Sequence, residues 1–247
     1  DQAVPNSDSE LAEQMLTVLL QKISPENLRK LWVSAALARS SISFLLLRCI
    51  DSSAVDSLMS MGVLRQRERR LTIEPGILIE PLMAWGHDKL DLASLHATLA
   101  DAWSTLRVTR YYSDQSIGFH LLSAGQSERA LPHLLRASRQ ALNDGRFALS
   151  IMASKQAYKA AQNFKSHMAS TEALLIHLQS RIASRNDRGI DVLFEQLEEL
   201  CAKDTLSRGR LMWLKAWHSF EQNQFALSLE QLQMASQDLQ RIGDAQH

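Results

Sequence analysis

Apolar residues recur at helical spacing along most of the chain. In the N-terminal part this spacing predicts helices over residues 9–23, 24–38, 41–50, 51–62, 77–85 and 92–106. Ser24 is the expected N-cap of the second helix, with Pro25 at its first position. Asp51 is expected to cap the start of the fourth helix, and Gly62 permits a left-handed residue at its end. The helices of this part are therefore short and closely spaced.

One stretch departs from helical spacing. Between Val63 and Gly76 apolar and polar residues partly alternate, and Pro75-Gly76 closes the segment. The pattern predicts two short strands around a tight polar turn. Helices followed by such a β-ribbon are typical of a winged helix. We therefore expect an N-terminal winged-helix domain with a small β-wing.

After residue 108 the pattern becomes more regular. Helices separated by short polar breaks are predicted over 114–124, 127–143, 146–163, 167–184, 188–203, 206–222 and 225–241. All five prolines lie at or before Pro132, and proline disrupts helix interiors. The predicted fold class is all-α, with the winged-helix domain and its flanking helices over 1–107. A tetratricopeptide-like (TPR-like) α-solenoid is expected over 108–247.

Two breaks in the second domain share nearly the same residues. GRFALS spans 145–150 and NQFALS spans 223–228, each with an alanine seven positions after its serine. These small residues predict close packing between neighbouring helices. A second set of small residues, within 118–137, fits the same repeat with the opposite helix order. We favour the order in which 206–222 is the first helix of its repeat.

The helix over 206–222 carries Trp213, Trp217 and Phe220 at i, i+4 and i+7. In the favoured order this face lines the inner groove of the solenoid. The three side chains are then a platform for a protein partner or a small inducer. The alternative is that the triplet is core, packed against a neighbouring helix, as aromatic stripes at helical spacing commonly are.

Three segments carry a resemblance to a known family. They are LRKLWVSAALARSSISFLLLRCIDSSAVDSLMSMGVL at 28–64, LHATLADAW at 95–103 and HLLSAGQSERAL at 120–131. Together they resemble the winged helix and repeat region of STAND ATPases, especially bacterial transcriptional regulators of the LuxR and AfsR types. The resemblance implies that the winged helix is a regulatory element packing on an upstream ATPase domain. It also implies that the repeats receive an inducer or a partner protein.

The composition adds limits to this picture. The chain has 27 basic and 27 acidic residues, so no net charge attracts it to nucleic acid or an anionic membrane. Cys49 and Cys201 lie far apart, which indicates neither a disulfide framework nor a thiolate metal site. No signal peptide or apolar run of ~20 residues is present. We expect a cytoplasmic, bacterial protein and, because it starts at Asp1, a part of a longer one.

Catalytic motifs are absent from the sequence. There is no GxxxxGK[ST] loop, HExxH, CxxC, GxSxG or GxGxxG. His87, Asp88 and His96 are the nearest approach to a ligand cluster, and we expect no metal there. We predict that this chain is not an enzyme and holds no cofactor. An ATPase domain in the parent protein would precede Asp1.

Four arginines, Arg65, Arg67, Arg69 and Arg70, cluster in the predicted wing. Two roles are open: contact with phosphates, or ion pairs with an acidic neighbouring domain, which we favour. The helix that would read DNA, within 52–64, contains no Lys or Arg. We therefore do not expect this fragment to bind DNA.

Three functions stay open on these grounds. The first is a regulatory and sensor fragment of a STAND-type signalling ATPase, which binds an inducer or partner protein in the repeat groove and relays the event through the winged helix. The second is a non-enzymatic TPR-like scaffold for protein–protein interaction. The third is a DNA-binding winged helix, which requires the wing arginines to hold phosphates.

Overall fold

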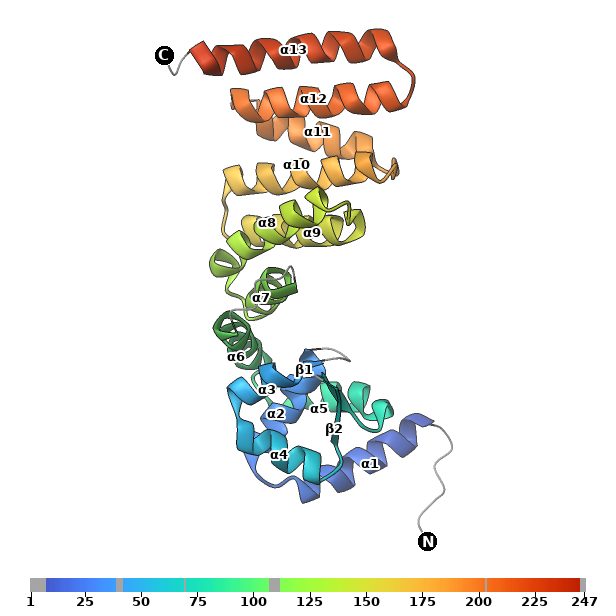
Figure 1. Ribbon diagram of the computed structural model, residues 1–247, viewed down its shortest axis with the longest axis vertical. Helices are drawn as coiled ribbons and strands as arrows, with labels where there is room; N and C mark the ends of the chain where they lie inside the picture. The colour runs from blue at the N-terminus through green and yellow to red at the C-terminus, as the bar shows by residue number, and fades with distance from the viewer. Residues whose placement is uncertain (1–7, 39–41, 69, 107–111, 203, 245–247) are drawn as a thin grey trace. The chain divides into compact units, whose positions relative to one another are not determined.

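The computed structural model describes residues 8–38, 42–68, 70–106, 112–202 and 204–244 (Figure 1). The chain divides into two compact units. Unit 1 comprises residues 1–109 and 123–125, and unit 2 comprises residues 110–122 and 126–247. The domain boundary predicted between residues 107 and 108 lies outside the described residues.

Unit 1 contains helices and a small sheet, in agreement with the predicted all-α class. Its elements are α1 (Asp8–Lys22), α2 (Glu26–Leu37), β1 (Ile42–Ser43), α3 (Phe44–Ile50), α4 (Ser52–Ser60), β2 (Leu64–Arg67), β3 (Arg70–Ile73), the short 3-10 helix η1 (Gly76–Leu78), α5 (Ile79–Lys89) and α6 (Leu92–Thr105). The two strands expected within 63–76 are confirmed.

Local sequence sets the ends of α4. The Asp51 carboxylate accepts a hydrogen bond from the Ala54 backbone N–H at 2.9 Å, which satisfies a donor that the helix leaves unpaired. At the other end Gly62 has a φ of +75°, a conformation that a side chain would disfavour. Both predicted end signals of this helix are confirmed.

The predicted start of α2 is wrong by one residue. Pro25, not Ser24, is the N-cap, and its carbonyl accepts from the Arg29 N–H at 3.3 Å. The Arg29 side chain donates to the carbonyls of Leu20 (2.7 Å) and Ile23 (2.5 Å), at the end of α1. This contact fixes the link between α1 and α2 without a serine cap.

The helix predicted over 41–50 is also corrected. The described part of that segment begins with strand β1, and α3 starts only at Phe44. β1 pairs with β3, with Ile42 opposite Leu71, in an antiparallel sheet of order β1-β3-β2. Pairing with a strand almost thirty residues away overrides the local helical pattern, as tertiary contacts commonly do.

The core of unit 1 is one cluster of large apolar side chains. It draws on α1 to α6 and on strands β2 and β3, with Trp32, Leu58, Leu71 and Leu99 all fully buried. Leu71 and Ile73 of β3 and Leu64 of β2 hold the sheet on this core, while Arg65, Gln66 and Arg67 of β2 are exposed. The sheet therefore has one buried face and one solvent face.

Unit 2 is a succession of helices close to the predicted bounds. They are α7 (Tyr112–Ser123), α8 (Ser127–Asn143), α9 (Phe147–Asn163), α10 (His167–Ala183), α11 (Ile190–Cys201), α12 (Thr205–Glu221) and α13 (Phe225–Asp244). From α8 to α13 these helices stack one on the next (Figure 1). Alternate helices also meet, since α10 contacts both α8 and α12.

The two FALS segments make the same contact in two different hairpins. Ser150 on α9 donates its hydroxyl hydrogen to the Ser138 carbonyl of α8 at 2.8 Å. Ser228 on α13 donates in the same way to the Ala216 carbonyl of α12, also at 2.8 Å. Ser150 and Ser228 are both buried, so the α8–α9 and α12–α13 hairpins share one packing geometry.

Candidate partner-binding groove

The predicted aromatic triplet lies on the exposed side of α12. Trp213 is 43% exposed and Phe220 is 56% exposed, while Trp217 is half-buried. Leu206, one further heptad back, is exposed on the same face. Among the described residues, therefore, Trp213 and Phe220 are not covered by a neighbouring helix as a core stripe would be.

The rings are held in mutual contact. The ring centroids of Trp213 and Trp217 are 5.5 Å apart, and those of Phe220 and Phe225 are 5.6 Å apart with an edge-on geometry. These are favourable arrangements for aromatic pairs. The Trp217 indole N–H donates to the Glu221 carboxylate at 3.4 Å, which leaves its ring face apolar. The structure thus brings together all three predicted residues and adds Phe225.

A cavity of about 370 Å³ lies beside this cluster, between α12 and α13. Its lining is Trp213, Ala216, Trp217, Phe220, Ser228 and Leu232. None of these side chains is charged. We call the cavity and its three aromatic side chains, Trp213, Trp217 and Phe220, the aromatic groove.

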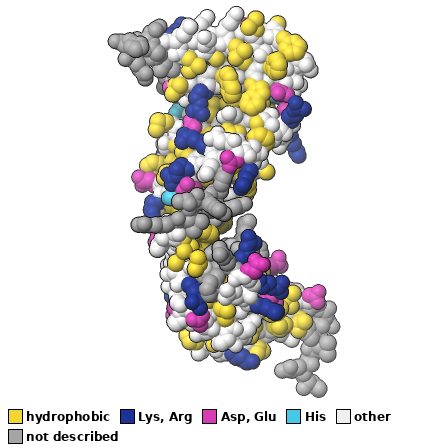
Figure 2. Space-filling model, in the orientation of Figure 1, with side chains coloured by type: hydrophobic (Ala, Val, Ile, Leu, Met, Phe, Trp, Pro, Cys, Tyr) yellow, Lys and Arg dark blue, Asp and Glu magenta, His cyan; other side chains and the backbone are white. Residues whose placement is uncertain are grey.

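Helix α13 extends the apolar surface beyond the groove. Phe225, Leu229, Leu232 and Leu239 are exposed and follow one face of this helix at i, i+4, i+7 and i+14. Figure 2 shows hydrophobic side chains gathered over this end of unit 2. The spacing of these residues was visible in the sequence. It did not reveal exposure, because a helix face packed against a neighbour has the same pattern.

A chain of ion pairs crosses the three alternate helices of unit 2. Glu172 on α10 accepts from Arg139 on α8, at 2.9 Å, and from Arg210 on α12. Burial raises the pKa of Glu172, but the hydrogen bonds and charges of Arg210 and Arg139 outweigh it and hold that pKa below 4.5. Arg210 precedes Trp213 by three residues on α12, so this group of ion pairs lies next to the aromatic groove.

The wing arginines are displayed on the solvent face of the sheet. Arg65 and Arg67 lie on β2 and Arg70 on β3, all exposed, and Arg67 is the cross-strand partner of Arg70. Arg67 also pairs with Glu74 at 3.2 Å. Arg69 lies outside the described residues. The structure therefore brings Arg65, Arg67 and Arg70 together on one face.

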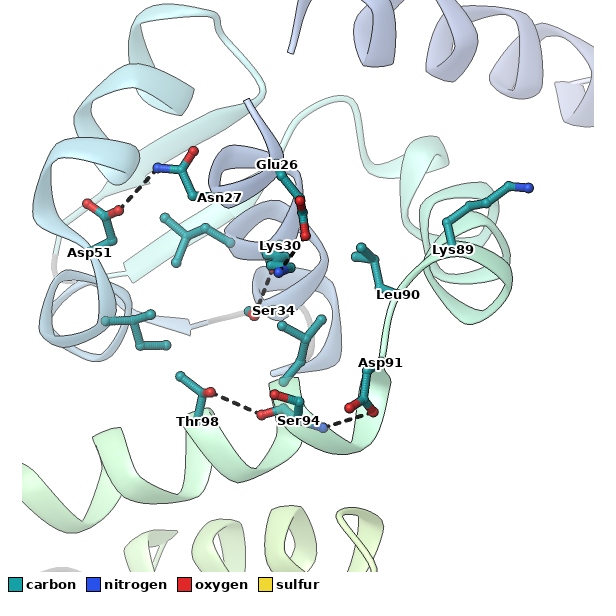
Figure 3. A pocket seen from close by; sticks show the side chains of 13 residues that line it. Glu26, Asn27, Lys30, Ser34, Asp51, Lys89, Leu90, Asp91, Ser94 and Thr98 are labelled. Atoms are coloured by element: carbon teal, nitrogen blue, oxygen red, sulfur yellow. Dashed lines mark hydrogen bonds and ion pairs between the residues drawn. The ribbon is translucent and has the colours of Figure 1, made fainter. Parts of the chain in front are cut away.

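Unit 1 contains a cavity of about 550 Å³ that the sequence did not indicate (Figure 3). Its carboxylates already have structural roles. Asp51 caps α4, Asp91 caps α6 through the Ser94 N–H at 3.2 Å, and Glu26 pairs with Lys30 at 2.5 Å. Each of these groups is therefore used to start or brace a helix.

The histidines singled out in the sequence do not converge. His87 lies 3.7 Å from Asp88 on the surface, whereas His96 is buried and its pKa is lowered by that burial. Over the described ranges, no group of three or more His, Cys, Asp or Glu side chains is arranged to hold a metal ion. None of the described helices has the length and apolar character needed to cross a bilayer.

Comparisons of this chain with protein-family models, with curated proteins and with solved structures find no match.

Proposed function

We propose that this chain is a regulatory fragment of a STAND-type signalling ATPase or transcriptional regulator that binds a partner protein through the aromatic groove. Unit 1 is, in this proposal, a winged helix that relays the binding event, and unit 2 is a TPR-like solenoid that receives the partner. The observation that carries the proposal is the exposed apolar surface of α12 and α13. Large exposed apolar patches on folded proteins mark interaction sites.

The composition of the surface indicates the kind of partner. Trp and Arg are the residues that most often dominate binding energy at protein interfaces. Here Trp213 lies on the same face of α12 as Arg210, and Arg139 of α8 shares the Glu172 carboxylate with Arg210. Arg139 and Arg210 share the carboxylate of Glu172, so these three side chains together carry one positive charge. We therefore propose an amphipathic partner segment with apolar anchors and acidic flanks.

The winged-helix assignment rests on the arrangement within unit 1. Three short helices, α2 to α4, precede an antiparallel ribbon whose solvent face presents Arg65, Arg67 and Arg70. The helix before the ribbon, α4, has no basic residue, and its Asp56 pairs with Arg48 at 2.5 Å. These features support an interdomain contact of the arginines over major-groove readout of DNA.

A peptide selection tests the groove. A phage-displayed peptide library is selected on the full chain, and enriched peptides are measured against the chain and its Trp213→Ala variant by isothermal titration calorimetry. We expect enriched peptides to combine Trp, Phe or Leu with Asp or Glu, and to lose about 30-fold in affinity in the variant, the size of an interface hot spot.

Phe164→Ala provides the matched control, because Phe164 is a similarly exposed aromatic residue of unit 2 that is not part of the groove. Equal affinity of the selected peptides for the chain and for Trp213→Ala would reject the groove. Circular dichroism of Trp213→Ala distinguishes a loss of peptide affinity at the groove from unfolding of the variant. Salt-sensitive binding of duplex DNA that is lost in Arg65→Ala/Arg67→Ala/Arg70→Ala would favour the DNA-binding alternative instead.

The complete open reading frame separates the regulator from the scaffold. A nucleotide-binding domain with a GxxxxGK[ST] loop before Asp1 supports the STAND-type regulator. A reading frame without one leaves the groove proposal in place and favours the non-enzymatic TPR-like scaffold.

A further inference from the structure

Unit 2 contains a second cavity, of about 600 Å³, lined by α9, α10, the segment after α10 and α11. It shares no lining residue with the aromatic groove. Its volume is within the usual range of small-molecule sites, roughly 300–1,000 Å³. We call it the basic cavity, since Lys155, Arg181 and Arg188 line it and no Asp or Glu does.

Among the described residues, none of these three cations has an acidic partner. Among the residues that the structure describes, neither Lys155 nor Arg188 forms an ion pair. Arg181 donates to the backbone carbonyl of Asn186 at 3.2 Å and to its side-chain oxygen at 3.3 Å, both neutral acceptors. By contrast, Arg139 and Arg210 are both paired with the Glu172 carboxylate. No described carboxylate therefore forms an ion pair with the cations of the basic cavity.

His177 lines the cavity, and the positive charges of Arg181 and Lys155 act on its ring. It lines the wall, with its Nδ1 at 3.1 Å from the Ser154 hydroxyl. Burial lowers the pKa of His177, and the charges of Arg181 and Lys155 lower it further, against a hydrogen bond with the Ile151 backbone that raises it. Lys155 of α9 and Arg181 of α10 therefore both act on the His177 ring.

The start of α11 lies at the edge of the same cavity. Gly189 lines it and is the N-cap of α11, with a φ of +71° and no side chain to cap the first turn. The N-terminus of a helix carries partial positive charge and unpaired N–H groups. The nearby Asp187 carboxylate accepts from Gln222 of α12 instead, at 3.1 Å.

Apolar and aromatic side chains also line the cavity, beside the neutral polar Asn186 and Gln196. Leu174 is buried and Tyr158 is half-buried. The lining therefore offers a ligand both cations and apolar or aromatic side chains.

We propose that the basic cavity binds a small organic phosphate whose non-phosphate part is apolar or aromatic. Lys155, Arg181 and Arg188 hold the phosphate, and Leu174 and Tyr158 contact the rest of the molecule. The site goes beyond the proposed function, because it uses none of the residues of the aromatic groove and does not depend on a protein partner.

Phenyl phosphate tests this proposal by isothermal titration calorimetry on the full chain. We expect saturable, salt-sensitive binding that is tighter than that of phenol or of inorganic phosphate. Of these three compounds, only phenyl phosphate can contact both the cations and the apolar side chains of the cavity. Lys155→Gln/Arg188→Gln is expected to weaken binding at least about tenfold. Both side chains are exposed and without ion pairs, so the variant is expected to fold.

Lys159→Gln is the matched control. Lys159 lies one turn further along α9, is as exposed as Lys155 and does not line the cavity. Its substitution removes one positive charge, against two in Lys155→Gln/Arg188→Gln, and is expected to leave phenyl phosphate affinity within about twofold. Absence of saturable binding at millimolar phenyl phosphate, or equal weakening by Lys159→Gln, would overturn the proposal.

Histidine NMR supplies a second readout that locates the ligand. Bound phosphate is expected to raise the pKa of His177, because it offsets the Lys155 and Arg181 charges that face this ring. The ring resonances of His167, which is not a cavity residue, are expected to keep their chemical shifts when phenyl phosphate is added. Binding without a response at His177 would show that phenyl phosphate binds elsewhere and would reject the site.

Discussion

The two units of this chain differ in the side chains that they bury. Unit 1 surrounds Trp32 with leucines, isoleucines and valines drawn from nearly all of its elements. In unit 2 the buried residues of α8 and α9 are largely alanine and serine, with Ser138, Ser150 and Ser154 fully buried, whereas α10, α11 and α12 share a second leucine-rich cluster. Small residues let helix backbones approach closely, so α8 and α9 pack against each other at short range.

This difference has an energetic consequence. Unit 1 has one large core, in which a buried leucine packs against several elements. Removing such a side chain therefore weakens the packing of the whole unit. At the close contacts of α7, α8 and α9 in unit 2, added volume costs more than lost volume, because there is no room at the contact. Unit 1 and this part of unit 2 should therefore fail in opposite ways when side chains are made smaller or larger.

The largest effect is expected from truncating the core of unit 1. Leu58→Ala removes a fully buried side chain and should lower the free energy of unfolding of unit 1 by about 2–5 kcal/mol. Hydrogen exchange read by mass spectrometry on the full chain should show faster exchange in peptides of unit 1. Peptides of α8 to α13 should keep their protection, since the core residues of unit 1 lie between Leu16 and Ala102.

Leu45→Ala is the control for this truncation. It makes the same chemical change on α3, where the Leu45 side chain is 58% exposed, and should cost less than about 0.5 kcal/mol. If Leu58→Ala accelerated exchange equally in both units, the separation of their cores would be refuted.

The next effect separates two glycines of unit 2. A Cβ added at Gly118 on α7 would lie 2.6 and 2.7 Å from side-chain carbons of Leu134 and 3.2 Å from its backbone N. Gly118→Ala should therefore destabilise the chain by about 1–3 kcal/mol. At Gly209 on α12 the nearest atoms are 3.4 Å away. Gly209→Ala should instead stabilise by up to about 1 kcal/mol, because alanine favours the helix.

Urea unfolding followed by far-UV circular dichroism measures both changes. The two variants replace the same residue type in a helix of the same unit, so helix propensity alone predicts the same sign for both. Stabilisation by Gly118→Ala would mean that the α7–α8 contact has spare volume, and the contrast between the two units would then fail at that contact.

Sequence patterns located most elements, and the exceptions have a common cause. Asp51 and Gly62 act within one helix, so their roles could be predicted. β1 was predicted as helix because its pairing with Leu71 is not visible in local spacing. The start of α2 was misplaced because the Arg29 side chain, not Ser24, secures that junction.

The sites show the same limit. Trp213 and Phe220 share a helix face, so their grouping was predictable from spacing. The exposure of the Leu232 side of α13 was not, since it depends on what packs against that face. The basic cavity escaped notice because Lys155, Arg181 and Arg188 come from separate segments, and only the packing of α9, α10 and α11 brings them together.

The smallest effect concerns pH and the ion pairs between helices. In unit 2, Glu172 joins α10 to α8 and α12. The described carboxylates of unit 1 with a lowered pKa act more locally, since Glu26 is exposed and pairs with Lys30 on its own helix and Asp51 caps α4. A lowered pKa contributes stability that is present above the ordinary value of 4.5 and is lost as the pH falls through the folded-state value. Acid should therefore loosen the helix contacts of unit 2.

Glu172→Gln measures this contribution. At pH 7 the variant should be less stable than the parent chain by about 1 kcal/mol, a modest value because Arg139 and Arg210 are partly exposed to solvent. The difference should shrink as the pH falls below 4.5 and the parent carboxylate takes up its proton. Urea midpoints at pH 7 and at acid pH give the comparison, with Glu195→Gln on α11 as control, since Glu195 is exposed and forms no ion pair among the described residues. A deficit of equal size at both pH values would show that Glu172 stabilises unit 2 by packing, and the ionic contrast between the units would have to be abandoned.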